Sequence, residues 1–222
     1  MDPDAFARAY PQIFHMAEQE NWPAILERGL LSTSELLDQY RYTGAEREKI
    51  EAMHRPECVT IRAPGLPPAV IRDQAVLKWE DLEPLLLDGH TPASWCRLIN
   101  GKVFFWAERY RLDFLLGARN YRGVPHVVLT IDTAALMTRY AERTTVTTIN
   151  SGSALPTRRG PEKRGNATFQ PLAAFRGGRA IEVAVERRVD GIDRIAVRSE
   201  LWLRNGPSDE PTMLKVLWTR KG

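Results

Sequence analysis

Apolar residues near the N-terminus predict a strand followed by a helix. Residues 13–16 form a short apolar run that predicts a strand ending at His15. Asn21 precedes Trp22 and Pro23, and proline is well tolerated in the first turn of a helix. We expect the Asn21 side chain to cap this helix and Gly29 to end it in a left-handed conformation. The result is a polar strand end facing the start of a helix.

The rest of the chain alternates between helical and extended patterns. Helical spacing predicts helices over residues 33–54 with a break at 41–49, and over residues 79–99, 108–116 and 133–140. Apolar or β-branched runs predict strands over residues 58–61, 69–71, 102–106, 126–131, 144–149, 179–186, 195–203 and 213–218. The run at 126–131 is almost wholly apolar, which is typical of a central strand. We expect a single α+β domain over residues 1–222, with helices concentrated in the first half and antiparallel strands in the second.

Composition adds limits to this prediction. The chain has 222 residues, of which 43% are hydrophobic and 27% charged, so it can bury a core. Its net charge of +3 permits a polyanionic partner without requiring one. No apolar run approaches a membrane-spanning length and no signal peptide precedes the first strand, so we expect a cytoplasmic protein without membrane association. The two cysteines and four histidines lack metal-ligand spacing, so we expect reduced thiols and no metal site.

One carboxylate stands out in the second half of the chain. Glu182 lies within a predicted strand, on a face whose neighbours are Ala180 and Ala184. Small neighbours leave room around the carboxylate, as a site that faces a ligand needs. The alternative is a solvated face of an edge strand, and Glu186 on the same face agrees with that alternative. Alternation by itself does not decide between them.

Aromatic and basic residues supply two further candidate features. Phe104, Phe105 and Trp106 precede Tyr110 and could form a stacking wall for an aromatic ring, although aromatic stripes also fill cores. A loop over residues 156–166 has no periodicity and carries the cations Arg158, Arg159, Lys163 and Arg164. Glycine and proline interrupt these cations, so we expect them to stay exposed. They could contact phosphates or simply be solvated.

The order of these features resembles the ADP-ribosyltransferase superfamily, and most closely its DarT-like branch, which modifies nucleic acid. The matching block is His15, Asn21, Ile25 and residues 29–32, followed by the aromatic strand at 103–106. The series continues with the valine-rich strand at 127–129, the small-residue turn at 150–154 and the strand segment Ile181-Glu182-Val183. The chain is also similar to a group of uncharacterised bacterial proteins that share residues 71–74, Ile-Arg-Asp-Gln, and the Phe-Trp strand.

The resemblance implies split antiparallel β-sheets with flanking helices and transfer of ADP-ribose from NAD, without a metal. The implied acceptor is nucleic acid ahead of protein, and a toxin of this kind has an antitoxin as a candidate partner. Glu182 takes the position of the catalytic carboxylate, and the basic loop takes that of the acceptor-recognition segment. Arg72 is preferred over Arg62 as the arginine that holds NAD. The implied NAD-binding residues are His15, Met16, Asn21, Gly29, Leu30, Arg72, Phe105, Trp106 and Tyr110.

Two alternative functions stay open. An NAD-dependent RNA 2′-phosphotransferase would require a denser arginine set than the sequence assigns. A non-catalytic module with the same fold would bind nucleotide or nucleic acid, and Ala17, where the DarT-like branch has threonine, keeps that alternative in view.

Overall fold

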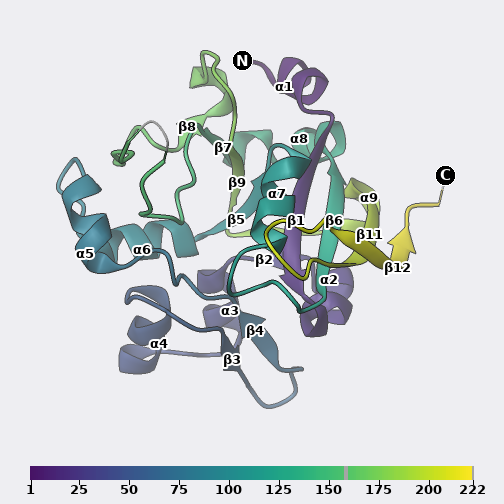
Figure 1. Cartoon of the computed structure of the whole chain (residues 1–222), viewed down its shortest axis with the longest axis horizontal. Coiled ribbons are helices and arrows are strands. Elements are labelled where there is room, and N and C mark those ends of the chain that lie inside the picture. Colours follow the sequence, from purple (N-terminus) through teal and green to yellow (C-terminus); the bar gives the residue numbers. More distant parts are fainter. Residues whose placement is uncertain (158–159, 222) are drawn as a thin grey trace.

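An antiparallel sheet of eight strands forms the centre of the protein (Figure 1). The structure is a computed structural model that describes residues 1–157 and 160–221. The strands lie in the order β12-β11-β6-β1-β5-β9-β7-β8. Their bounds are β1 Gln12–Glu18, β5 Lys102–Trp106, β6 His126–Asp132, β7 Thr144–Thr147, β8 Gln170–Pro171, β9 Glu182–Glu186, β11 Ala196–Leu203 and β12 Thr212–Thr219.

Helices and two small sheets surround the main sheet. The helices are α1 Pro3–Ala9, α2 Trp22–Arg28, α3 Thr33–Gln39, α4 Gly44–Glu51, α5 Trp79–Leu82, α6 Pro92–Asn100, α7 Arg109–Leu116, α8 Thr133–Tyr140 and α9 Ile192–Ile195. Short 3-10 segments are η1 Gln19–Asn21, η2 Glu83–Leu85, η3 Ala141–Arg143 and η4 Leu172–Ala174. One small sheet pairs β2 Leu30–Leu31 with β10 Arg188–Val189, and the other pairs β3 Val59–Ile61 with β4 Ala69–Ile71. None of the helices among the described residues combines the length and apolarity that crossing a bilayer requires.

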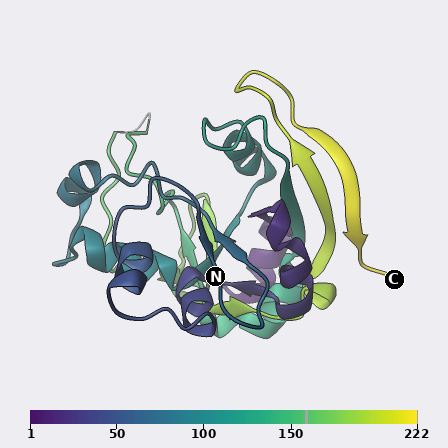
Figure 2. The same ribbon diagram turned by 90° about the horizontal axis from the view of Figure 1, so that it is seen from below.

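The predicted central position of the strand at 126–131 is confirmed. Each residue from His126 to Ile131 is buried, and β6 lies between β1 and β11. β11 and β12 form a long hairpin at one edge of the molecule (Figure 2). The largest group of buried hydrophobic side chains includes residues of β1, β6 and β9 together with α8. The antiparallel strands and flanking helices that were predicted are therefore present.

The sheet divides into two halves that meet at a single pair of residues. β1 pairs with β6 over seven residues and β5 pairs with β9 over five, whereas β1 and β5 share only the pair of Phe14 and Trp106. The halves β12-β11-β6-β1 and β5-β9-β7-β8 consequently diverge from this point. Trp106 is also the register partner of Glu182, so the junction adjoins that carboxylate.

Local sequence signals place several helix ends. Thr91 and Asp132 cap α6 and α8 with their side chains, and the Ser32 hydroxyl caps α3. Gly29 ends α2 with a φ of +87°, which confirms the need for glycine. A Cβ atom there would lie 2.3 Å from the Val189 carbonyl oxygen. The close approach of β10 thus imposes glycine as strongly as the backbone angle does.

Several expectations about elements differ from the structure. The helix predicted over residues 79–99 is interrupted, because α5 ends at Leu82 and α6 begins only at Pro92. His15 lies in the middle of β1 and not at its end. The helical region after residue 33 breaks at Tyr40 and resumes at Gly44, so most of the segment predicted as non-helical belongs to α4. β9 lies between β5 and β7, which rules out the edge-strand alternative for Glu182. Strands from the first half, β1 and β5, occupy the centre of the sheet, because long-range pairing and not chain order sets strand position.

Candidate active site

A cavity of about 330 Å³ opens where β1 and β5 diverge. Its walls come from both halves of the sheet, from the corner between α2 and α3, and from the chain after β4. The volume lies in the range of small-molecule sites. Nine candidate residues line it, namely His15, Met16, Asn21, Gly29, Leu30, Arg72, Phe105, Trp106 and Glu182. The structure therefore brings together residues that lie far apart in the sequence.

Glu182 is a buried carboxylate in the wall of this cavity. It is only 5% exposed and begins β9 in the sheet interior. Its Oε2 accepts hydrogen bonds from the Ser151 backbone N–H at 3.0 Å and from the Thr147 hydroxyl at 3.3 Å. Burial raises the pKa of Glu182 to about 7, against the opposing effects of these hydrogen bonds and of the Arg164 charge. Both protonation states of the carboxylate are consequently populated near neutral pH.

The turn that donates to Glu182 is itself fixed by surrounding residues. Trp95 donates its indole N–H to the Ser151 carbonyl at 3.2 Å. Arg164 donates to the Ser153 carbonyl at 2.8 Å, and the Ala154 N–H donates to the Val76 carbonyl at 2.9 Å. The small-residue turn at 150–154 is therefore fixed in place, and its Ser151 N–H donates to the Glu182 carboxylate. Because the Ser151 N–H is a fixed backbone donor, it needs little rearrangement when charge develops on the Glu182 carboxylate.

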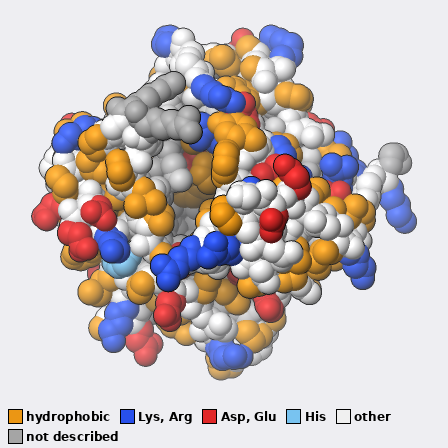
Figure 3. Space-filling model, viewed as in Figure 1, with side chains coloured by type: hydrophobic (Ala, Val, Ile, Leu, Met, Phe, Trp, Pro, Cys, Tyr) orange, Lys and Arg blue, Asp and Glu red, His pale blue; other side chains and the backbone are white. Residues whose placement is uncertain are grey.

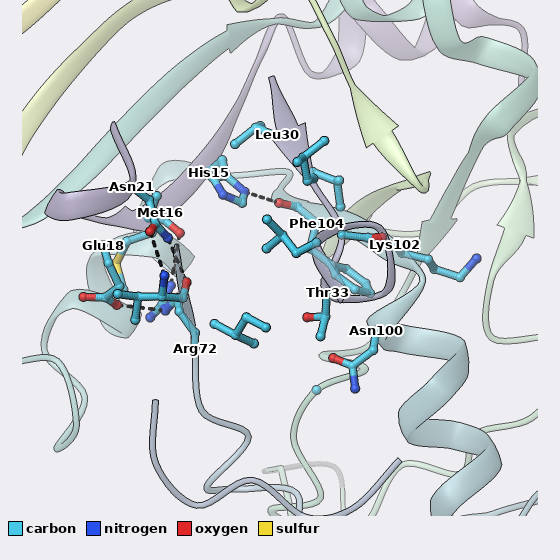
Figure 4. A pocket seen from close by; sticks show the side chains of 18 of the residues that line it. His15, Met16, Glu18, Asn21, Leu30, Thr33, Arg72, Asn100, Lys102 and Phe104 are labelled. Atoms are coloured by element: carbon cyan, nitrogen blue, oxygen red, sulfur yellow. Dashed lines mark hydrogen bonds and ion pairs between the residues drawn. The ribbon is translucent and has the colours of Figure 1, made fainter. Parts of the chain in front are cut away.

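His15 reaches across the split between the two halves (Figure 4). Its Nδ1 lies 2.7 Å from the Phe104 carbonyl oxygen. Desolvation lowers the pKa of His15 to about 4, and the charge of Arg72 acts in the same direction. The ring is thus neutral near pH 7, and because a carbonyl only accepts, Nδ1 carries the proton. The other nitrogen, Nε2, is left as a hydrogen-bond acceptor.

Arg72 lies at the end of the cavity where Glu18, Asn21 and Met16 also gather (Figure 4). Its guanidinium donates to the Met16 carbonyl at 3.1 Å, lies 3.4 Å from the Glu18 carboxylate and stacks over the Tyr121 ring at 4.2 Å. Arg62 is exposed on the β3–β4 hairpin and does not line the cavity. Of the two candidate arginines, Arg72 is therefore the one beside the cavity.

Two arginines at the cavity retain unused donors. Arg72 Nη2 and the Nε and Nη1 atoms of Arg28 are buried without a hydrogen-bond partner in the described part of the chain. Arg55, a third arginine of the lining, is already bound by the Arg72 and Ile50 carbonyls. Unpaired buried guanidinium donors favour an anionic group such as a phosphate. Arg28 and Arg72 each bring a positive charge to the wall of the cavity.

The Asn21 side chain does not cap α2, contrary to the prediction. Its amide donates to the Val70 carbonyl at 2.8 Å and accepts from the Val70 N–H at 2.9 Å. It thereby occupies the place of a strand partner for β4 and attaches the β3–β4 hairpin to the corner after β1. The cap prediction failed because the side chain has a distant backbone partner that the local sequence does not reveal.

Some predicted site residues lie elsewhere. Tyr110 stands on α7, is 37% exposed and does not line the cavity. Lys163 is exposed and donates to the Pro84 carbonyl. Arg164 is buried, contrary to the expectation that the loop cations stay exposed, because its guanidinium binds the Ser153 and Glu162 carbonyls. The candidates Arg158 and Arg159 lie outside the described residues.

Sequence reasoning also missed several polar residues of the lining. They include Glu18, Arg28, Asn100, Lys102 and Tyr121. Lys102 carried a signal, because a lysine that begins an apolar strand is unusual unless it is paired, and its ammonium binds Glu186. Among the described residues, no three His, Cys, Asp or Glu side chains group in a way that could hold a metal ion.

The fold and site can be compared with known proteins. A search of curated proteins finds no match to this chain. A family model described as a family of unknown function, DUF7002, matches residues 11–201. This match spans most of the chain and all residues of the cavity, from Phe14 to Glu182. The chain therefore belongs to the DUF7002 family of unknown function.

Proposed function

We propose that this protein transfers ADP-ribose from NAD to an acceptor, with nucleic acid ahead of protein. The observation that carries the proposal is the buried Glu182 carboxylate, held by the Ser151 N–H in the wall of a cavity that His15 also lines. The cavity has an aromatic strand beside the carboxylate and spare arginine donors. These are the features that a nicotinamide ring, a ribose and a pyrophosphate require.

The cavity residues suit the parts of NAD in turn. Trp106, which is half-buried beside Glu182, offers a wall for the nicotinamide ring. Phe105 is only 1% exposed and packs in the core on the opposite face of β5, so it does not serve as part of this wall. The Nε2 acceptor of neutral His15 suits a ribose hydroxyl, which can donate to it. The unpaired guanidinium donors of Arg28 and Arg72 suit the pyrophosphate. In this placement NAD is a substrate that is consumed, and no metal takes part.

Glu182 is assigned the chemical step. The bond between C1′ of the nicotinamide ribose and the nicotinamide nitrogen breaks, and nicotinamide leaves with the electron pair. The acceptor atom then bonds to C1′ and loses its proton to Glu182, which passes it to water. The transition state resembles an oxocarbenium ion, and an ionised carboxylate nearby stabilises that positive charge. A carboxyl group with a pKa of about 7 is suited to both tasks at neutral pH.

The acceptor class can be tested directly. Purified protein is incubated with NAD labelled in its adenylate half, together with separate pools of DNA, RNA and protein. We expect label in a nucleic-acid pool and none in matched reactions with Glu182→Gln. Label in the protein pool alone would show that the acceptor is protein and would leave the proposed ADP-ribose transfer unchanged. Absence of label from each pool, with NAD left intact, would contradict the proposal and favour a non-catalytic binding module.

A further inference from the structure

Helix α7 presents aromatic and basic side chains on its outer surface. Phe114 is 68% exposed, the highest value among the large hydrophobic residues found exposed in the described part of the chain. Tyr110, one turn earlier, meets the Phe114 ring edge-on at a centroid distance of 6.0 Å. Around α7 the space-filling view shows hydrophobic side chains at the surface with both basic and acidic side chains near them (Figure 3). This exposed aromatic pair adds little to the core and is free to contact a partner.

Arginine side chains surround these rings. The guanidinium of Arg111 lies 5.1 Å from the centre of the Tyr110 ring, and that of Arg179 lies 4.9 Å from it. Arg119 and Arg122 are exposed on the turn that follows α7 and have no ion-pair partner among the described residues. Glu108 and Asp113 pair with Arg179 and Arg109, whereas no ion pair is found for Arg111, Arg119 and Arg122 in the described part of the chain.

This surface is next to the cavity. Leu115 of α7 and Tyr121 of the following turn line the cavity, while Phe114 and Arg119 point outward to solvent. A nucleic-acid strand bound along α7 would therefore lie next to residues of the cavity wall. We propose that α7 and the turn after it bind single-stranded nucleic acid, with Phe114 stacking on a base and Arg119 and Arg122 contacting phosphates.

The chemistry of the surface favours this occupant. Exposed aromatic rings interleaved with arginine match single strands, whose bases are free to stack. A duplex hides its bases, so it would gain only the phosphate contacts. A protein partner would gain apolar area from Phe114 but would leave the unpaired arginines without counter-charges. The assignment of this strand as the acceptor rests on the proposed function, whereas binding itself does not.

Binding can be measured without NAD, by fluorescence anisotropy of a labelled oligothymidylate over a series of salt concentrations. Phe114→Ala should weaken binding roughly tenfold, the effect of losing one stacked base. Replacing Arg119 and Arg122 with serine should flatten the log–log salt dependence by about 0.7 for each lost phosphate contact. The exposed positions of all three residues mean that these variants should fold normally.

Matched controls lie on other surfaces. Arg139 and Arg143 are exposed arginines beside Tyr140, at 5.8 Å and 5.0 Å from its ring centre, and Leu214 is an exposed apolar residue of β12. Replacing both arginines with serine, or Leu214 with alanine, should leave binding unchanged. The proposal is overturned if the oligothymidylate does not bind at low salt, if duplex binds as tightly, or if the α7 variants behave like the controls. This binding assay contains no NAD. Its result therefore does not depend on whether the protein transfers ADP-ribose.

Discussion

Two titratable groups in one cavity have pKa values displaced in opposite directions. Burial holds the pKa of Glu182 at about 7, above its usual 4.5, so the folded protein binds this proton more tightly than the unfolded chain. Its contribution to stability therefore falls as pH rises from 4.5 to 7. The pKa of His15 is lowered from 6.5 to about 4, so its contribution falls as pH drops through that interval. In the wild type these two effects oppose each other between about pH 4.5 and 6.5.

Single variants should separate the two effects. Glu182→Gln removes the Glu182 effect, so its free energy of unfolding relative to the wild type should rise between pH 4.5 and 7, by about 3 kcal/mol. His15→Asn removes the His15 effect, so its free energy of unfolding relative to the wild type should fall between pH 4 and 6.5. Urea unfolding at a series of pH values measures both curves. Parallel curves for the two variants would show that neither group is displaced as described.

The sequence predicted helix caps correctly where the side chain binds its own helix, but it failed where a side chain binds a distant element. The caps of α6 and α8 follow from Thr91 and Asp132, which act on backbone groups within three residues. Asn21 matched a cap equally well, yet its amide binds Val70 in another element. Arg164 resembled a solvated loop cation, but it supports the turn behind Glu182. Whether a polar side chain binds its own helix or a distant element depends on which groups the folded chain brings near it. The spacing of residues in the sequence does not show which groups these are.

The corner between α2 and β2 gives a test of element packing. Gly29→Ala should destabilise the protein by about 3 kcal/mol or more, because a Cβ would clash with the Val189 carbonyl and the positive φ adds strain. Gly65 has a φ of +77°, and no atom lies within 4 Å of the position that a Cβ would take there. Gly65→Ala should therefore carry only the backbone cost of about 1 kcal/mol. Equal losses in thermal or urea unfolding would show that β10 does not approach Gly29 so closely.

For the whole molecule, the split of the sheet is the feature that creates the site. The apolar runs in the sequence predict where strands lie. The nearly complete absence of polar residues in β6 also indicated that this strand is central. It did not predict that β1 pairs fully with β6 and at one residue with β5. That pairing opens the cavity and places His15 and Glu182 in its walls. The resemblance singled out residues that line this cavity, whereas the geometry that joins them required the fold.

We propose that Glu182 drives cleavage of the glycosidic bond of NAD. The most direct measurement is the initial rate of nicotinamide release for the wild type, Glu182→Gln and the exposed control Glu142→Gln. NAD affinity is measured for the same proteins by calorimetry. We predict that Glu182→Gln lowers the rate at least about a hundredfold with little change in NAD affinity, and that Glu142→Gln matches the wild type. A Glu182→Gln protein that releases nicotinamide at a near-normal rate would show that Glu182 does not carry the chemical step.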